Sequence, residues 1–509
     1  MPVARDVLDH ARTAPGRVAV ALDGEAGDVT YAQLARRVLS TAARLAEGGS
    51  GVSGGPVMPG GVVAIVPPGP AAAAAPPSAG ARWSQTLVTF LAVDLVGAVP
   101  LVCDASWGDR HREDVLAGVR PDHRVFVSAP PARPDRPVSS LPGPARALLA
   151  SSLAARARPD DLAWAGFTSG STGRPRAVVR TRGSWTGSFS TVSDLAGVSA
   201  TSTVLVPGDL ATSLYCFGAV HALAAGATLR PAVARRDLGP AALASDVLHV
   251  TPAQLEIVLD TLAPSARRRH RTALVGGAGL PDAVRRRAER ADVHVVPYYG
   301  AAELSFVAFD PDGTGLRPFP GTEIEVRVDG EDSHGTVWVR SPWLASGYLA
   351  GADGPLRRSD GWATVGDLAD PRAADGPLVL RGRGTGAITV GAATVLPEDV
   401  EAVLADAPGV ADVVVLGTHH PRWGEVVTAV VVVEAREGAE TATSDEDSRL
   451  LEELQHRSTV ALSPAQRPRR WFVAASLPRT GSADGGKLAR AAVAEALPGY
   501  RRLRGRAQG

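Results

Sequence analysis

Short apolar runs alternate with longer segments of helical spacing through the middle of the chain. The clearest runs are residues 204–206, 273–275 and 294–296, which are rich in β-branched side chains. Strands that alternate with helices form a mostly parallel sheet with helices packed on its faces. We therefore expect an α/β fold. Residues 61–66 predict another buried strand, and residues 28–34 predict a strand that leads into an amphipathic helix.

The hydrophobic pattern changes twice toward the C-terminus. Strict alternation of apolar and polar residues from 322 to 340 predicts antiparallel strands in a small β-barrel-like subdomain. After residue 383 the pattern predicts a helix at 397–405, strands at 410–416 and 426–434, a polar loop at 435–447 and another helix. This α+β unit of about 125 residues has the size of an independent domain. We expect an N-terminal domain of layered α/β sheets, residues 1–383, and a small C-terminal domain, residues 384–509.

No segment has the pattern of a membrane span or of a secretion signal. The most apolar stretch, residues 87–103, contains Asp94 and predicts a buried helix that runs into a strand. The first 20 residues carry scattered Arg and Asp and lack a continuous apolar core. The Pro-rich segment 67–81 shows no periodicity and predicts a surface insertion, and a second Pro-rich segment, 122–144, predicts a surface connection. We therefore expect a cytoplasmic protein.

The composition is that of a globular protein, with 45% hydrophobic and 21% charged residues. The formal net charge is zero, so no bulk charge attracts nucleic acid or anionic lipid. Cys103 and Cys216 match no disulfide or metal spacing, and we expect both to be buried. We expect His419 and His420 to be solvated histidines of a turn, because further metal ligands at suitable spacing are missing from the sequence.

The 53 basic residues include a single lysine, Lys487, and all the others are arginine. This bias indicates a GC-rich genome in which Arg replaces Lys wherever any cation suffices. Lys is a compact charge on a flexible stem, whereas Arg is a wide planar fork, so the two are not interchangeable at a tight site. The retained lysine is therefore a candidate for a specific chemical role.

A loop rich in glycine and hydroxyl side chains follows a predicted strand around Trp164. Glycines let backbone N–H groups approach phosphate oxygens, hydroxyls add donors, and an arginine adds positive charge. The loop consists of Thr168, Ser169, Gly170, Ser171, Thr172 and Gly173, and Arg176 follows it. Its spacing differs from the G-x-x-x-x-G-K-[ST] loop of phosphate-transferring ATPases. We therefore expect a phosphate-binding loop of another kind.

Residues 168–176 resemble the phosphate loop of the adenylate-forming superfamily, which includes acyl-CoA synthetases, adenylation domains of peptide synthetases and firefly luciferase. Further segments are similar to the other motifs of that family and follow in its order: residues 274–278, 299–303, 361–367, 382–383 with 395–401, and 477–480 with 486–487. Four tryptophans lie beside these motifs, and we expect them to be core residues: Trp164, Trp185, Trp362 and Trp471.

The resemblance implies an ATP-binding site. Tyr299 would stack on the adenine, within a motif completed by Gly300 and Ala301. The backbone of a strand end would pack on the other face of the adenine, at Gly276, Gly277 and Ala278.

The resemblance also implies the polar groups of the reaction. Glu303 would be a hard oxygen ligand for Mg²⁺ beside the phosphates. Asp367 would accept both ribose hydroxyls, and Arg383 would reach the ribose or a phosphate. Lys487 would bridge the substrate carboxylate and the α-phosphate and stabilise the charge that develops between them. The C-terminal domain would be mobile, rotating at a hinge near Thr385 after adenylation.

The substrate segment favours one branch of the family. Residues 207–218 contain Phe217 and Gly218 but not the Asp that pairs with an amino acid substrate in peptide synthetases. The segment looks more like stand-alone acyl-CoA synthetases, which favours an aryl or a medium- or long-chain acyl acid. We expect Thr212, Phe217 and Ala302 at the substrate.

Several positions depart from the family pattern. Thr212 and Arg182 replace histidines, and Ala302 replaces a threonine. Thr385 replaces the hinge Asp or Lys, and Ala392 replaces a glycine. Three extra residues lie between Thr480 and Gly486. Most departures concern the substrate or the second reaction step, so adenylation is the better supported step.

Three functions remain open at this point. The first is an AMP-forming acid–thiol ligase that makes an acyl-adenylate and transfers the acyl group to CoA. In the second, the adenylate passes to another nucleophile, such as a carrier-protein thiol or an amine. The third is a nucleotide-binding protein without catalysis. The retained Lys487 and Glu303 argue against the third.

Overall fold

The fold is described from a computed structural model. It describes residues 2–22, 27–49, 51–68, 79–127, 157–168, 176–262, 270–328, 335–373, 376–383, 388–391, 393–395, 397–421, 423–433, 444–480, 487–488 and 490–503. Contacts divide these residues into two compact units. The N-terminal unit contains the described residues of 1–105, 116–168 and 176–381, and the C-terminal unit contains those of 106–115 and 382–509.

The first sheet of the N-terminal unit has nine strands in the order β15-β14-β13-β12-β11-β9-β10-β1-β2. Their bounds are β1 (Val18–Val20), β2 (Val29–Thr30), β9 (Thr203–Val206), β10 (Thr228–Pro231), β11 (Val247–Val250), β12 (Arg271–Val275), β13 (Val293–Ala301), β14 (Ser305–Phe309) and β15 (Arg317–Pro318). Every pair of neighbours is parallel along the part β13-β12-β11-β9-β10-β1 of this order, which confirms the predicted, mostly parallel sheet.

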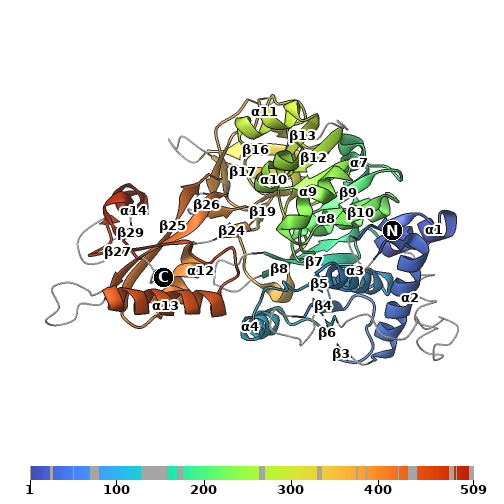
Figure 1. The fold of residues 1–509 in the computed structure, drawn as a ribbon, viewed down its shortest axis with the longest axis horizontal. Coiled ribbons are helices and arrows are strands. Elements are labelled where there is room, and N and C mark those ends of the chain that lie inside the picture. The colour runs from blue at the N-terminus through green and yellow to red at the C-terminus, as the bar shows by residue number, and fades with distance from the viewer. Residues whose placement is uncertain are drawn as a thin grey trace. The chain divides into compact units, whose positions relative to one another are not determined.

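Alternate residues of this sheet enter two different cores. Val204, Val206 and Leu274 belong to the large core of the unit, whereas Leu205 and Ala273 belong to a second one. This period of two is the pleat of a strand, and both faces are apolar because helices cover both. Helices α9 (Arg235–Leu243), α10 (Pro252–Leu262) and α11 (Asp282–Arg290) contribute to the second core and lie beside these strands in Figure 1.

The second sheet has seven strands in the order β18-β8-β7-β5-β4-β6-β3. Their bounds are β3 (Val52–Ser53), β4 (Val62–Val66), β5 (Val99–Val102), β6 (His123–Phe126), β7 (Leu162–Thr168), β8 (Arg176–Thr181) and β18 (Gly347–Tyr348). Strand β6 lies inside the segment 122–144 that was expected to be a surface connection, so the expectation was wrong for residues 123–126. Residues 128–144 of that segment lie outside the described part of the chain. The strand forms because parallel pairing with β4 satisfies its backbone and buries alternate side chains.

The large core contains side chains of both sheets and of the helices α1 (Val3–Thr13), α2 (Tyr31–Glu47), α3 (Ala79–Leu95), α7 (Phe189–Ala196) and α8 (Ser213–Ala224). Helix α2 begins with a capping box in which Thr30 and Gln33 bond each other's backbone N–H. Helix α3 followed by β5 confirms the helix and strand predicted at 87–103. Within the described ranges, every helix is too short or too polar to cross a membrane.

A buried ion pair joins two helices of the N-terminal unit. Asp94 of α3 accepts a hydrogen bond from Arg182 of α6 (Arg182–Thr186) at 3.0 Å, and both side chains are almost fully buried. The second oxygen of Asp94 accepts the backbone N–H of Ala4 at 3.1 Å. Arg182 therefore balances a buried carboxylate.

The third sheet is mostly antiparallel, as the alternation at 322–340 predicts. Its strands are β16 (Glu323–Arg327), β17 (Gly335–Arg340), β19 (Arg357–Ser359), β20 (Trp362–Thr364), β21 (Asp367–Ala369) and β22 (Leu380–Arg383). Strands β16 and β17 pair from Glu323 opposite Arg340 to Arg327 opposite Thr336. Buried side chains of this sheet form a separate small core with residues of β14.

The C-terminal unit has an α+β fold in which helices pack on both faces of a sheet. Its elements are β23 (Ile388–Val390), β24 (Ala393–Val395), α12 (Pro397–Ala405), β25 (Val410–His420), β26 (Gly424–Val433), α13 (Ser444–Ala461), β27 (Arg470–Ala474), β28 (Arg479–Thr480), β29 (Lys487–Leu488), α14 (Arg490–Ala496) and β30 (Arg501–Arg502). Helices α12 and α13 share one core with this sheet, and α14 shares another.

Two local expectations for this unit were wrong. Helix α13 begins at Ser444, so the predicted loop 435–447 was wrong for residues 444–447, and its residues 435–443 lie outside the described part of the chain. His419 and His420 lie in strand β25 and not in a turn, because the strand continues to pair with Glu425 and Gly424 of β26. The expected burial of both cysteines and of the four tryptophans is confirmed.

We expect Asp94→Asn to lower the free energy of unfolding by about 3–5 kcal/mol, because it leaves the buried Arg182 charge without its partner. Urea denaturation followed by tryptophan fluorescence measures this loss. The control is Asp9→Asn, which removes an exposed ion pair with Arg12 and should change the value by less than about 0.5 kcal/mol. Equal values for the two variants would contradict the prediction.

Candidate functional site

The predicted site segments follow neighbouring strands of the nine-stranded sheet. Residues 207–212 follow β9, residues 276–278 follow β12, and residues 299–303 include the end of β13. These strands are parallel and lie in the order β13-β12-β11-β9, so their carboxyl ends meet at one edge. Ligands of open α/β sheets bind outside that edge. The tertiary structure thus brings together segments that are far apart in the sequence.

Tyr299 and Asp367 form a direct contact at this edge. The hydroxyl of Tyr299 in β13 donates a hydrogen bond of 2.5 Å to Oδ2 of Asp367, the first residue of β21. The tyrosine ring is half-buried, and the carboxylate is buried. Glycine at position 300 is required by space, because a Cβ there would lie 2.3 Å from the carbonyl oxygen of Ser305. The close approach of β13 and β14 therefore sets the position of Tyr299.

Gly276, Gly277 and Ala278 continue from the end of β12. A Cβ at Gly276 would lie 2.4 Å from the ring of Tyr298 in β13. The small residue therefore lets the β12 segment pass close to the neighbouring strand. Gly300 and Ala301 lie at the end of β13, and Ala302 follows in the turn that leads to Glu303.

Glu303 is a buried carboxylate in the turn between β13 and β14, with 4% of its surface exposed. Its Oε1 accepts a hydrogen bond of 3.0 Å from the hydroxyl of Tyr348. Its backbone carbonyl accepts the N–H of Ala345 at 2.8 Å. Tyr348 lies in β18 of the seven-stranded sheet, so this contact joins the two sheets of the N-terminal unit. Burial and the charge of Glu303 both raise the pKa of Tyr348, which therefore remains a donor.

Arg180 of β8 supplies a positive charge that acts on Glu303. Burial lowers the pKa of Arg180 to about 9, and the charge of Glu303 opposes this shift. The guanidinium stays protonated near neutral pH and donates to the backbone carbonyls of Ser184 and, at 2.6 Å, of Trp343. Arg180 and Tyr348 were not among the predicted site residues. The sequence signal for Arg180 is an arginine inside a strand of buried positions. Tyr348 lies outside the predicted motifs, so no sequence signal marks it.

The strands that flank the phosphate loop form an antiparallel pair. Thr168, the last residue of β7, lies opposite Arg176, the first residue of β8. Arg176 is buried, and its positive charge acts on Tyr348. The loop residues themselves lie outside the described part of the chain: Ser169, Gly170, Ser171, Thr172 and Gly173. The described ends of the loop thus lie beside the Glu303–Tyr348 contact.

Two of the three predicted substrate residues, Thr212 and Phe217, lie at helix α8. Thr212 is the N-cap residue of α8 and is half-buried, and Phe217 is buried one turn further along. The ring of Phe217 packs edge-on against Trp185, which stacks on Trp164 with ring centroids 4.2 Å apart. The segment after β9 therefore leads from a half-buried polar residue into an aromatic core.

The C-terminal candidates are described in the backbone alone. Lys487 lies in β29 opposite Thr480 of β28, and Arg383 is the last residue of β22. Thr385 lies outside the described residues. The expected contacts of these three side chains therefore stay predictions.

Among the residues that the structure describes, no three His, Cys, Asp or Glu side chains gather as a metal site. Glu303 supplies one buried carboxylate oxygen donor group. One carboxylate together with substrate phosphates and water is a common way to hold Mg²⁺. The donor set of this site therefore fits a cation that arrives with a nucleotide.

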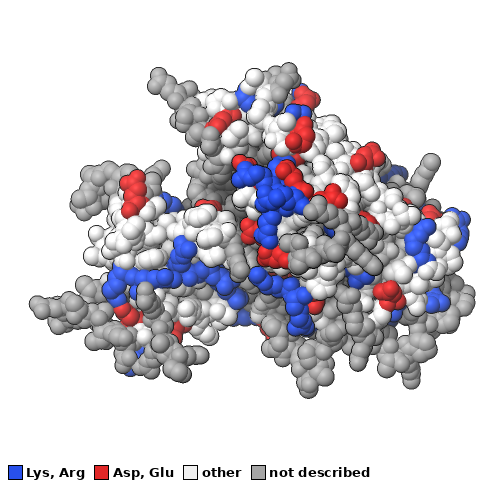
Figure 2. Space-filling view, turned by 45° about the horizontal axis from the view of Figure 1, so that its top comes forward, with Lys and Arg blue, Asp and Glu red and all other residues white. Residues whose placement is uncertain are grey.

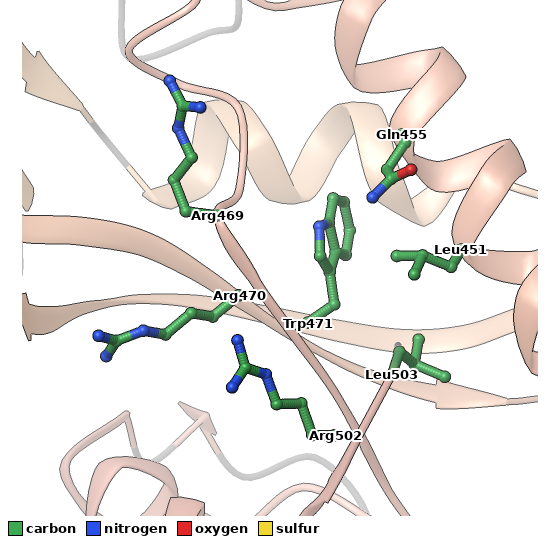
Figure 3. Close-up of a pocket in the computed structure, with 7 residues that line it drawn as sticks. All are labelled: Leu451, Gln455, Arg469, Arg470, Trp471, Arg502 and Leu503. Atoms are coloured by element: carbon green, nitrogen blue, oxygen red, sulfur yellow. The ribbon is translucent and has the colours of Figure 1, made fainter. Parts of the chain in front are cut away.

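The C-terminal unit carries a pocket of about 330 Å³ with basic walls. It is lined by Leu451, Gln455, Arg469, Arg470, Trp471, Arg502 and Leu503. Figure 3 shows the ring of Trp471 between the apolar side and the arginine side of the pocket. Arg470 donates to Thr418 at 2.9 Å, whereas Arg469 and Arg502 are exposed and have no ion pair within the described ranges. Basic side chains form a band on this unit in Figure 2.

Two family models match the chain. The model for the AMP-binding enzyme matches residues 78–349, and that for the AMP-binding enzyme C-terminal domain matches residues 399–483. An uncharacterised acyl–CoA ligase of Bacillus subtilis is 31% identical over 66% of this chain and 68% of its own length. The 4-chlorobenzoate–CoA ligase of an Arthrobacter species is 26% identical over 92% of this chain and 91% of its own.

Solved structures show the same architecture. The amide bond synthetase McbA from Marinactinospora thermotolerans aligns with a TM-score of 0.73 at 25% identity, over 97% of this chain and 99% of its own. The large layered α/β region and the smaller C-terminal region predicted from the sequence are thus those of adenylate-forming enzymes.

We expect Tyr348→Phe to lower ATP–pyrophosphate exchange by roughly tenfold, because it removes a hydrogen bond to a buried charged group. Exchange assays with an accepted carboxylic acid measure this loss. Tyr500→Phe is the matched control, since the half-buried Tyr500 side chain forms no hydrogen bond with the described residues. Equal exchange by both variants would show that Tyr348 does not support Glu303.

Proposed function

Because this chain belongs to the AMP-binding enzyme family, we propose that it activates a carboxylic acid with ATP and transfers the acyl group to CoA. The acid's carboxylate attacks the α-phosphate of ATP and forms an acyl-adenylate. The bond between the α-phosphorus and the oxygen that bridges to the β-phosphate breaks, and pyrophosphate leaves. The thiol of CoA then attacks the acyl carbon, which releases AMP and forms a thioester. The observation that carries the proposal is the buried Glu303 carboxylate, held by Tyr348 beside the positive charges of Arg176 and Arg180.

We propose that ATP binds at the carboxyl edge of the nine-stranded sheet. Tyr299 stacks on the adenine, and the residues after β12 cover its other face. Asp367, oriented by the Tyr299 hydroxyl, accepts the ribose hydroxyls. Thr168, Arg176 and the loop between them hold the phosphates, and Arg383 reaches the ribose or a phosphate. Glu303 would hold Mg²⁺, which supplies charge neutralisation to the phosphates when it is bound.

Lys487 is proposed to lie between the substrate carboxylate and the α-phosphate. Two anions must approach each other in this step, and a slim cation between them stabilises the developing charge. Residues 384–509 are proposed to be the mobile domain that delivers this lysine and then rotates near Thr385 for the second step.

The acid is proposed to be an aryl or an apolar acyl acid. The support is the aromatic surroundings of Phe217 on α8 and the missing carboxylate partner for an amino group in this helix. Thr212 and Ala302 are half-buried near these segments and are proposed to touch the substrate.

CoA is the favoured acceptor because the chain is similar to CoA ligases of bacteria and because CoA carries three phosphate groups. The arginine-lined pocket of the C-terminal unit offers free positive charge for such an anion. A carrier-protein thiol or an amine is the second candidate. The amine is supported by the similarity to an amide bond synthetase.

We expect Lys487→Ala to lower ATP–pyrophosphate exchange by at least ~10²-fold, the size of effect seen when a preorganised charge-stabilising group is removed. Lys487→Arg should restore little, because a planar fork does not replace a compact ammonium. Arg449→Ala, an exposed cation of the same unit, is the control and should keep full exchange. Full exchange by Lys487→Ala would contradict the assigned role.

The acceptor is tested with a charge reversal in the pocket. We expect Arg469→Glu combined with Arg502→Glu to raise the KM for CoA by roughly tenfold, because the pocket no longer attracts the phosphates of CoA. The rate of ATP–pyrophosphate exchange should stay unchanged. Arg36→Glu, an exposed cation of α2, is the control. Product analysis with CoA, with a carrier protein and with amines distinguishes the acceptors. An unchanged KM for CoA would exclude the pocket from acceptor binding.

A further inference from the structure

Two buried histidines lie beside the proposed substrate helix. His221 is one turn after Phe217 on α8, and their rings stack with centroids 5.7 Å apart. His249 lies in β11, and its ring meets that of His221 edge-on at 6.2 Å. Gly218 makes this approach possible, because a Cβ at that position would lie 2.9 Å from the His249 ring. The helix and the strand thus meet around two imidazoles.

The hydrogen-bonding capacity of this pair is only partly used. Nε2 of His221 lies 2.8 Å from Oγ of Ser193. Nε2 of His249 is buried and forms no hydrogen bond with a described residue. The other three residues of β11 are valine and leucine, so an apolar side chain would suit this position better. A buried nitrogen without a partner is costly and needs an explanation.

The imidazoles add hydrogen-bonding groups without adding charge. Burial lowers the pKa of His221 to about 4 and that of His249 to about 3. A neutral imidazole has one donor nitrogen and one acceptor nitrogen. This pair therefore suits a neutral polar group and does not attract a second carboxylate.

The position of His249 fits the far end of a ring-containing acid. Gly218, which touches His249, follows Thr212 by six positions, or roughly 9 Å along a helix axis. This distance is similar to the length of an aryl acid with a substituent opposite its carboxyl arm. Phe217 and Phe306, whose rings are 5.0 Å apart, lie in the same cluster and suit an aromatic ring.

We propose that His249 is a specificity-determining residue that hydrogen-bonds a neutral polar substituent, such as a hydroxyl, at the far end of an aryl acid. The inference rests on the proposed function and adds the chemical class of the substrate. His221, held by Ser193, packs against His249 and positions its ring. The bound acid supplies the hydrogen-bond partner that Nε2 of His249 lacks among the described residues.

Matched pairs of acids test this proposal in ATP–pyrophosphate exchange: 4-hydroxycinnamate against cinnamate, and 4-hydroxybenzoate against benzoate. We expect kcat/KM to be at least about tenfold higher for the hydroxylated member of one pair, because a buried polar group is left unpaired by the other member. In His249→Leu this preference should fall to about threefold or less, mainly through KM. His249→Asn keeps a polar group and should retain part of the preference, and it also serves if the leucine variant does not fold.

The control is His123→Leu. His123 is likewise buried with a ring nitrogen that has no described partner, but it lies in β6 of the other sheet. This variant should leave the preference unchanged. Equal use of the two members of both pairs by the unaltered protein, or an unchanged preference in His249→Leu, overturns the inference. Better exchange with unsubstituted alkyl acids than with all four probes also overturns it, whereas no exchange with any acid overturns the proposed function itself.

Discussion

The burial of one carboxylate organises the candidate site. Glu303 lies in a turn at the end of a strand, and a charge in that position needs compensation because the protein interior solvates it poorly. The compensation comes from the other sheet, through the hydroxyl of Tyr348 and the positive charge of Arg180. The two sheets of the N-terminal unit are therefore joined where the phosphates of a nucleotide are proposed to bind. Loss of one partner would leave a buried charge and would affect the fold and the site together.

Arginine fills the structural cationic roles in this chain. Arg182 balances the buried Asp94, and Arg180 combines a charge near Glu303 with hydrogen bonds to two backbone carbonyls. A guanidinium serves these places because it has several donors in one plane. Because arginine fills the structural roles, the single lysine is a candidate for a specific chemical role. Arginines also line the pocket of the C-terminal unit, where Arg469 and Arg502 are exposed.

The aromatic cluster around α8 combines apolar rings with two polar imidazoles. Phe217, Trp185 and Phe306 make the core apolar, yet His221 and His249 place polar nitrogens inside it. Burial keeps both imidazoles neutral, so the cluster can discriminate among acids by hydrogen bonding without electrostatic attraction. A purely apolar pocket would discriminate among substrates by size alone. One methylene or hydroxyl changes the free energy of binding to such a pocket only modestly.

The sequence by itself determined the family, the alternation of strands and helices and the location of the motifs, because periodicity and glycine-rich loops are local properties. It also predicted the burial of the tryptophans and cysteines correctly. It did not reveal strand β6, whose short segment is stabilised by pairing with β4, or the end of β25, where His419 and His420 continue a ladder that a local pattern does not show. Only the tertiary structure decided that Tyr348 supports Glu303, that Tyr299 holds Asp367 and that His249 meets α8. These contacts join segments between about 30 and 70 residues apart in the chain, and they depend on which strands are neighbours and on the space left by Gly218 and Gly300.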